Sequence, residues 1–154
     1  MDGNHIGAFG HSQGAAGTVL VGADPRVHAI APLSGAPRSG TQDASVQIQC
    51  PTFYVTTQND IATPASIRQA YEYTPTPSVF GVTNGGNHDE YTNIADDPHV
   101  SGLTSNDGLR VRAAVAAWFD WHLKGKIELL PLFVGQNCGF CTDPNWMTFE
   151  SKGF

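Results

Sequence analysis

The residues best suited to chemistry are a serine, an aspartate and a histidine, each of which follows a short apolar run: Ser12, Asp60 and His88. A serine hydroxyl becomes a nucleophile when a histidine takes its proton, and a carboxylate holds that histidine in the required orientation. In hydrolases whose serine lies on a turn between a strand and a helix, the chain order is serine, acid, histidine, as here. The order predicts acyl transfer by a Ser-His-Asp triad.

Ser12 is the centre of the pentapeptide Gly10-His11-Ser12-Gln13-Gly14, which has the G-x-S-x-G pattern of a nucleophile elbow. Residues 5–9 before it are mostly apolar and predict a buried strand, and residues 15–21 after it predict a packed helix. Such a turn strains the backbone, so we expect flanking side chains to collide with the strand or the helix. The serine hydroxyl then lies at the N-terminus of a helix, whose dipole favours developing negative charge.

Four apolar runs predict the strands of one sheet: residues 5–9, 27–33, 51–57 and 79–83. Helices are expected from Thr63-Pro64 to about residue 73 and over residues 107–123, the latter closed by Gly125. Alternating strands and helices indicate an α/β fold with parallel strands and right-handed crossovers. The loops that carry the serine, acid and histidine then open at one edge of the sheet.

Other acids and histidines are alternatives to these three. Asp89 is next to His88, but adjacent residues rarely orient one another's rings, and the remaining loop acids are expected to be solvated: Asp43, Asp96 and Asp97. His99 is the alternative base, and a calcium site at Asp96-Asp97 is less favoured than solvation. The other side chains considered are expected to pack or to lie at the surface: His5 and His28 in either place, His11 supporting the elbow, His122 at the surface, and Trp118 and Trp121 packing the last helix.

The composition favours one globular domain over residues 1–154, with 40% hydrophobic residues and a net charge of −6. The few basic residues form no stripe, so a nucleic-acid partner is not expected, and no apolar run is long enough to span a membrane. Charged residues are only 14% of the chain, and we expect a secreted protein although no signal peptide is visible.

The three cysteines are Cys50, Cys138 and Cys141. A local disulfide between the last two, a bond from one of them to Cys50, and three reduced thiols all remain open. A single C-x-x-C pair is not enough for zinc, and no metal or cofactor is expected.

Three motifs carry a resemblance to a known family: Gly10 to Gly14, Asp60-Ile61-Ala62-Thr63-Pro64, and Gly86-Asn87-His88. Together they look like the carboxyl-terminal half of a serine α/β-hydrolase, similar to bacterial secreted esterases and lipases near the dienelactone hydrolase, chlorophyllase and cutinase-like group. Residues 117–125 resemble the last helix of that family, and the cysteine-bearing tail resembles one in some of its members.

The resemblance implies that Ser12 is the nucleophile, His88 the base and then the acid, and Asp60 the residue that orients the imidazole. It implies an oxyanion donor at Gln13 and places Ile61 at the substrate. Polyester hydrolases of this group usually carry a tryptophan in the loop after the next strand. Here residues 33–37 read Leu-Ser-Gly-Ala-Pro, which favours a small or aliphatic ester.

The family's sheet has about twice as many strands as are readable here, and its second oxyanion donor comes from a loop after an earlier strand. We therefore expect a partial α/β-hydrolase domain without the N-terminal strands, in which the strand before Ser12 is an unpaired edge. The alternative function is a catalytically incomplete half-domain that acts as an assembly module, or that needs a second copy or a partner chain. Thioesterases, peptidases and acyltransferases use the same triad, and the sequence does not separate them from esterases.

Overall fold

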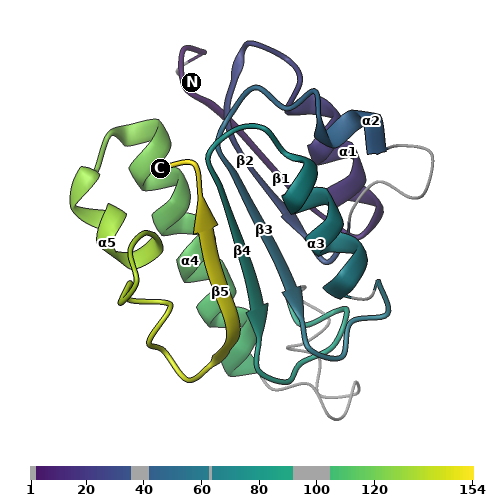
Figure 1. Ribbon diagram of the computed structural model, residues 1–154, viewed down its shortest axis with the longest axis vertical. Coiled ribbons are helices and arrows are strands. Elements are labelled where there is room, and N and C mark those ends of the chain that lie inside the picture. The colour runs from purple at the N-terminus through teal and green to yellow at the C-terminus, as the bar shows by residue number, and fades with distance from the viewer. Residues whose placement is uncertain (1–2, 36–41, 63, 92–104) are drawn as a thin grey trace.

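The structure, a computed structural model, describes residues 3–35, 42–62, 64–91 and 105–154 and has an α/β fold (Figure 1). Its elements in chain order are β1 (Ile6–His11), α1 (Gln13–Val21), β2 (Val27–Leu33), α2 (Gln42–Ser45), β3 (Thr52–Thr57), α3 (Pro64–Tyr73), β4 (Ser78–Thr83), α4 (Ser105–Lys124), the 3-10 helix η2 (Ile127–Leu129), α5 (Leu130–Phe133) and β5 (Trp146–Lys152). Strands and helices alternate as the sequence predicts.

The described strands form one five-stranded sheet in the order β1-β2-β3-β4-β5, and the four strands predicted from the sequence are its parallel part. All residues of β3 and β4 are buried, as is usual for parallel strands that helices cover on both faces. The fifth strand was not predicted. It pairs antiparallel to β4, with Phe80 opposite Glu150, at the edge away from β1.

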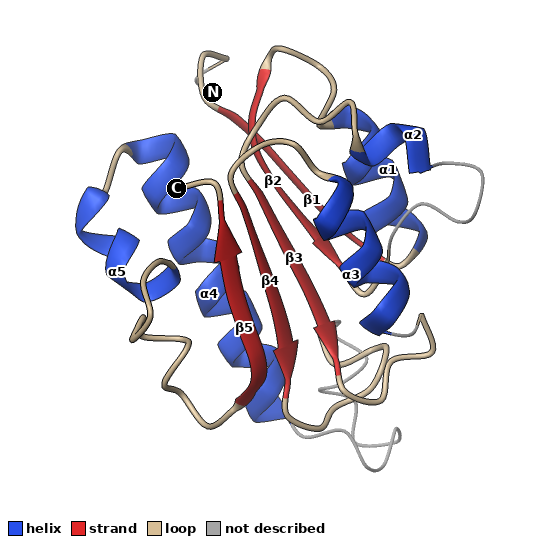
Figure 2. Cartoon of the chain, viewed as in Figure 1, coloured by secondary structure: helices blue, strands red, loops and turns tan. Residues whose placement is uncertain are grey.

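Helices cover both faces of the sheet (Figure 2). On one face α1 and α3 pack over an aliphatic and aromatic cluster that includes Val19, Ile30 and Tyr54. On the other face α4 packs over a cluster centred on Trp118, whose side chain is fully buried and whose indole N–H donates to the carbonyl of Ile30. The helix ends where predicted, because Gly125 takes a φ of +69°.

His122 was expected at the surface, but it is half-buried and its ring packs against the second cluster. Its ring lies 4.1 Å from the rings of both Trp118 and Trp121, which pack α4 as predicted. Its Nε2 atom is buried without a hydrogen-bond partner among the described residues. Burial lowers the pKa of His122 to about 4, because the imidazolium form would lose its hydration.

β1 is an edge strand of the described sheet, as the sequence analysis predicted for the strand before Ser12. The expectation that residues 5–9 form a buried strand is wrong, because no residue of β1 is fully buried and the edge formed by β1 and α1 is exposed and apolar. Phe9 on β1 is 67% exposed and Leu20 on α1 is 58% exposed. A Cβ added at Gly14 or Gly17 of α1 would meet no described atom within 4 Å. The helix is therefore packed on its sheet side and uncovered on the other.

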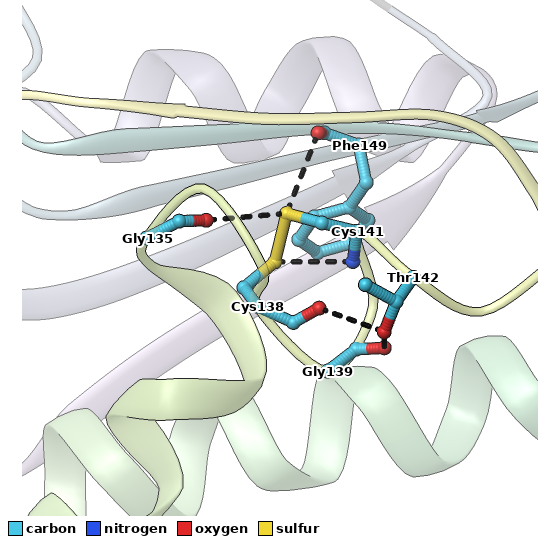
Figure 3. The surroundings of a disulfide bond; sticks show 6 residues. All are labelled: Gly135, Cys138, Gly139, Cys141, Thr142 and Phe149. Carbon is cyan, nitrogen blue, oxygen red and sulfur yellow. Dashed lines mark hydrogen bonds between the residues drawn. A yellow bond between two sulfur atoms is a disulfide. The ribbon is translucent and has the colours of Figure 1, made fainter.

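A disulfide joins Cys138 and Cys141 in the segment between α5 and β5 (Figure 3). The Sγ atom of Cys141 also lies against the carbonyl oxygens of Gly135 and Phe149, which places the cysteine loop against β5. Cys50 is free and buried, and burial raises the pKa of its thiol to about 11. Of the pairings left open by the sequence, the local one is present. Among the described helices, none is long and apolar enough to cross a membrane.

Candidate active site

Ser12 lies on the one-residue turn between β1 and α1 and has a φ of 56° and a ψ of −116°. This left-handed conformation is rare for a residue with a side chain and persists only where the surroundings hold it. The Ser12 amide donates to the carbonyl of Leu33 at 3.0 Å, and the Ser12 carbonyl accepts from the amide of Ala15 at 3.0 Å. A Cβ at Gly35 would lie 2.3 Å from the same carbonyl oxygen, so the loop after β2 approaches the turn closely.

The two glycines of the pentapeptide differ in their surroundings. A Cβ at Gly10 would lie 2.4 Å from the carbonyl oxygen of Gly14, so the turn excludes a side chain at residue 10. Gly14 has open space among the described residues, and the expected collision at residue 14 is therefore absent there. Only the first glycine is required by the contacts that the structure describes.

His88 contacts both other predicted residues of the triad. Its Nε2 lies 2.8 Å from the Ser12 Oγ, and its Nδ1 lies 2.8 Å from the Asp60 Oδ1. An ionised carboxylate can only accept, so Nδ1 carries a proton and donates to Asp60. In the neutral ring Nε2 then accepts from the Ser12 hydroxyl, which is the tautomer that a general base requires.

Asp60 is held as a carboxylate by its neighbours. Its side chain has no exposed surface; Oδ2 accepts from the Thr56 hydroxyl at 2.8 Å, and Oδ1 accepts from the Ala62 amide at 2.9 Å. Burial by itself raises the pKa of Asp60. The nearby hydroxyl of Ser34 and the amide of Ala62 oppose this effect. The His88 ring and the Thr56 hydroxyl lower the pKa as well. Together these four groups outweigh the effect of burial, so the pKa of Asp60 lies below its ordinary value.

The loop that carries His88 is tied to the loop that carries the acid. The Gln58 amide donates to the Gly85 carbonyl at 3.1 Å, and the Gly85 amide donates to the Gln58 Oε1 at 3.0 Å. Gly85 and Gly86 have φ values of 88° and 71°, which side chains disfavour, so the two glycines let the chain turn from β4 into this loop. The contributions of Gln58 and Thr56 were not predicted from the sequence.

Gln13 and Ile61 flank the contacts of the triad. Gln13 is the first residue of α1, where backbone N–H groups and the helix dipole favour negative charge, and its amide has no acceptor among the described residues. Ile61 follows Asp60 directly and is 80% exposed, so an apolar surface is available beside the acid loop.

One group of side chains has the composition of a metal site: His11, His88 and Asp89 each bring a ligand atom to within 4.8 Å of the others. Both ring nitrogens of His88 already bind Ser12 and Asp60, so a metal there would compete with the contacts of the triad. The alternatives His99, Asp96 and Asp97 lie outside the described residues, as do residues 36 and 37 of the loop after β2.

A scan against protein-family models finds no match, and a search of curated proteins finds none either. Solved structures with the same fold are found. The crystal structure of 2,6-dihydroxy-pseudo-oxynicotine hydrolase superposes with a TM-score of 0.63 at 19% sequence identity, over 81% of this chain and 42% of that one. A structure of FAE matches with a TM-score of 0.47 and 24% identity, over 56% of this chain and 40% of that one.

The first of these likenesses shows that the chain shares its α/β fold with part of that hydrolase. The chain spans less than half of the length of that hydrolase.

Proposed function

We propose that this protein is a serine hydrolase that cleaves carboxylic esters through an acyl-enzyme. The observation that carries the proposal is the alignment of Ser12, His88 and Asp60 at 2.8 Å and 2.8 Å, with the serine on a strained turn at the start of a helix. These are the positions of a nucleophile, its base and the carboxylate that orients the base.

In the acylation step the Ser12 Oγ attacks the ester carbonyl carbon while the His88 Nε2 takes the hydroxyl proton. Asp60 stays ionised and stabilises the imidazolium that forms, because its pKa is lowered by the hydrogen bonds it accepts. The imidazolium then returns the proton to the departing alcohol, and the carbonyl–oxygen bond to the alcohol breaks. Water attacks the acyl-serine with His88 again as the base, releasing the acid and the free serine.

The oxyanion of each tetrahedral intermediate needs hydrogen-bond donors. We assign the first to the backbone N–H of Gln13 at the start of α1. In the family that the sequence resembles, the second donor comes from a loop after an earlier strand, and its source for this chain stays a prediction. Loss of one such donor typically costs about 10²–10³ in rate, so the activity of this chain depends on where the second lies.

The substrate we propose is a small or aliphatic ester. Ile61 offers an exposed apolar side chain beside the acid loop, and the described part of the loop after β2, Leu33 to Gly35, carries no aromatic ring. We also propose export, because the Cys138–Cys141 disulfide is of a kind that persists mainly in oxidising compartments.

The test is a comparison of the folded chain with Ser12→Ala, on p-nitrophenyl acetate and butyrate and with a fluorophosphonate that labels activated serines. The wild type is expected to turn over both esters and to gain the mass of one adduct on a peptide that contains Ser12. Ser12→Ala should lose both signals, whereas the matched control Ser151→Ala, on β5, should keep both. A folded wild-type chain with neither turnover nor adduct would refute the proposal.

The exposed edge of β1 favours a second candidate, an assembly module in which a second copy of this chain pairs with that edge. Unpaired strand edges readily accept another strand, and Phe9 and Leu20 would lose their exposure in such a pair. Light scattering after size exclusion separates the two candidates. A monomer that is compact and active would contradict obligatory pairing, and a dimer that Phe9→Lys dissociates would support it.

A further inference from the structure

His11 makes a hydrogen bond that the reaction sequence above does not use. Its Nε2 lies 2.6 Å from the backbone carbonyl oxygen of His88. We propose that His11 is a positioning residue, which holds the backbone of the catalytic histidine so that its ring stays in reach of Ser12. Only the kinetic test of this inference rests on the proposed function.

The chemistry of the two groups sets the direction of this bond. A carbonyl oxygen accepts and cannot donate, so the Nε2 of His11 must carry a proton, in either the neutral or the charged ring. At 2.6 Å the bond is slightly shorter than the usual range for N–H···O bonds. His11 is therefore a donor to His88, and its role needs an N–H at that point.

His11 and Ser12 are consecutive, and both bind His88. Ser12 contacts the ring at Nε2, while His11 contacts the main chain at the carbonyl. The two contacts together fix the ring and the backbone of His88 relative to one short segment, the end of β1 and the turn that follows it. A displacement of the histidine loop away from the elbow would have to break both.

The hydrogen bonds between the histidine loop and the acid loop lie further from the catalytic ring. Gln58 binds Gly85, three residues before His88, and joins this loop to the acid loop and not to the elbow. The bond from His11 joins the His88 carbonyl to the end of β1. The His11 ring also packs against the His88 ring at 4.7 Å and meets the edge of Tyr91 at 6.1 Å.

Loss of the donor should affect the chemical step more than ester binding, because catalysis is sensitive to sub-ångström displacement of the base. We expect His11→Phe, which keeps a ring in place but has no N–H, to lower kcat about tenfold and to change KM less than about twofold. His11→Gln, which restores an N–H donor, should regain most of the lost kcat. His28→Phe, a histidine at the opposite end of the parallel strands, is the control and should change neither constant.

His11→Met and His11→Gln form a second pair of similar size that differ in the donor, in case the aromatic variant does not fold. The same variants are examined by proton NMR for the low-field resonance of the His88 Nδ1–H that is bound to Asp60. The resonance should be sharp in the wild type and His11→Gln, and should broaden through solvent exchange in the variants without a donor.

These results would overturn the proposal: kcat and the resonance unchanged in His11→Phe and His11→Met, or equal losses in His11→Gln and His11→Met. The NMR arm needs no substrate. A wild-type protein without esterase activity would therefore refute the proposed function, and the resonance would still test the role of His11.

Discussion

The hydroxyl of Thr56 offers a sharp test of how Asp60 is held. Thr56 is fully buried on β3 and donates to the Asp60 Oδ2 at 2.8 Å. Thr56→Val keeps the shape of the side chain and removes the donor, which leaves one carboxylate oxygen buried without this bond. Hydrogen bonds to charged groups contribute about 1.5–3 kcal/mol, so we expect the free energy of unfolding to fall by about that amount at neutral pH.

The neighbouring residue provides a matched control. Thr57 is also fully buried on β3, but its hydroxyl has no hydrogen-bond partner among the described residues. Thr57→Val makes the same chemical change and removes a hydroxyl that is desolvated without compensation, so we expect no loss and a gain of up to about 1 kcal/mol. The difference between the two variants isolates the bond to Asp60.

The dependence on pH has a definite sign. The pKa of Asp60 is lowered from 3.8 in the fold, so its carboxylate stabilises the protein above pH 3.8, and this contribution is lost as the pH falls through the lowered value. Thr56→Val removes one cause of the lowering, so the pKa of Asp60 should rise. The deficit of Thr56→Val relative to Thr57→Val should accordingly be largest near pH 7 and shrink at acidic pH.

Urea denaturation followed by tryptophan fluorescence at about pH 7 and about pH 3.5 measures both quantities. Equal stability of the two variants at neutral pH would refute the reasoning, because the two hydroxyls would then be equivalent. A deficit that grows toward acidic pH would refute the assigned ionisation of Asp60.

Three further predictions concern the site and its support. Asp60→Asn should lower kcat on p-nitrophenyl esters by about 10³–10⁴, because an amide in place of the carboxylate no longer fixes the Nδ1–H tautomer of His88; a loss below tenfold would contradict the assignment. The free energy of unfolding should be unaffected by protonation of His122 above pH 6.5 and should fall by about 2–3 kcal/mol as the pH falls toward 4, because the unfolded chain takes up a proton that the half-buried ring does not. In chemical denaturation at several pH values, His122→Phe should remove this fall. Reduction of the Cys138–Cys141 disulfide, which closes a short loop, should cost about 2 kcal/mol of stability in thermal unfolding and leave kcat unchanged, whereas a loss of kcat at a temperature where the fold persists would show that the loop supports the site.

The parallel part of the sheet and the contacts between the three candidate residues could be predicted from the sequence for one reason. Parallel strands place their carboxyl ends at the same edge of the sheet, so residues in the loops that follow β1, β3 and β4 are brought near one another. Ser12, Asp60 and His88 follow those strands and lie in contact. Strand order and motif spacing were sufficient for this part.

The fifth strand was missed because its pattern is irregular. The register shifts between Val82 and Thr83, which pair with Thr148 and Trp146, and Met147 is left between them. The two residues that β5 packs into the core, Trp146 and Phe149, are therefore three apart, and a period of two is not visible. The alternation of strands and helices, which predicts parallel strands, also gives no indication of an antiparallel last strand.

The residues that support the site could not be predicted, because each acts across a tertiary contact. The bond of Gln58 to Gly85 joins two loops, and that of His11 to His88 spans 77 positions in the chain. Thr56 reads as an ordinary strand residue. The position of His122 was not predicted, because a polar residue on an amphipathic helix is expected to face solvent, whereas here its ring packs against two tryptophan rings.

The strained turn at Ser12 is held from one side. The Ser12 amide donates to the Leu33 carbonyl, and Gly35 lies close to the Ser12 carbonyl. Both contacts come from the end of β2. Two neighbours of the turn are open: Phe9 is largely exposed, although its ring lies 6.3 Å from that of Phe119, and a Cβ at Gly14 would meet no described atom. A backbone strain of about 1–3 kcal/mol is therefore borne by the β2 side and by the helix that Ser12 begins. It follows that a strand added at the β1 edge would change stability and association, while the distance between Ser12 and His88 is set by contacts already present.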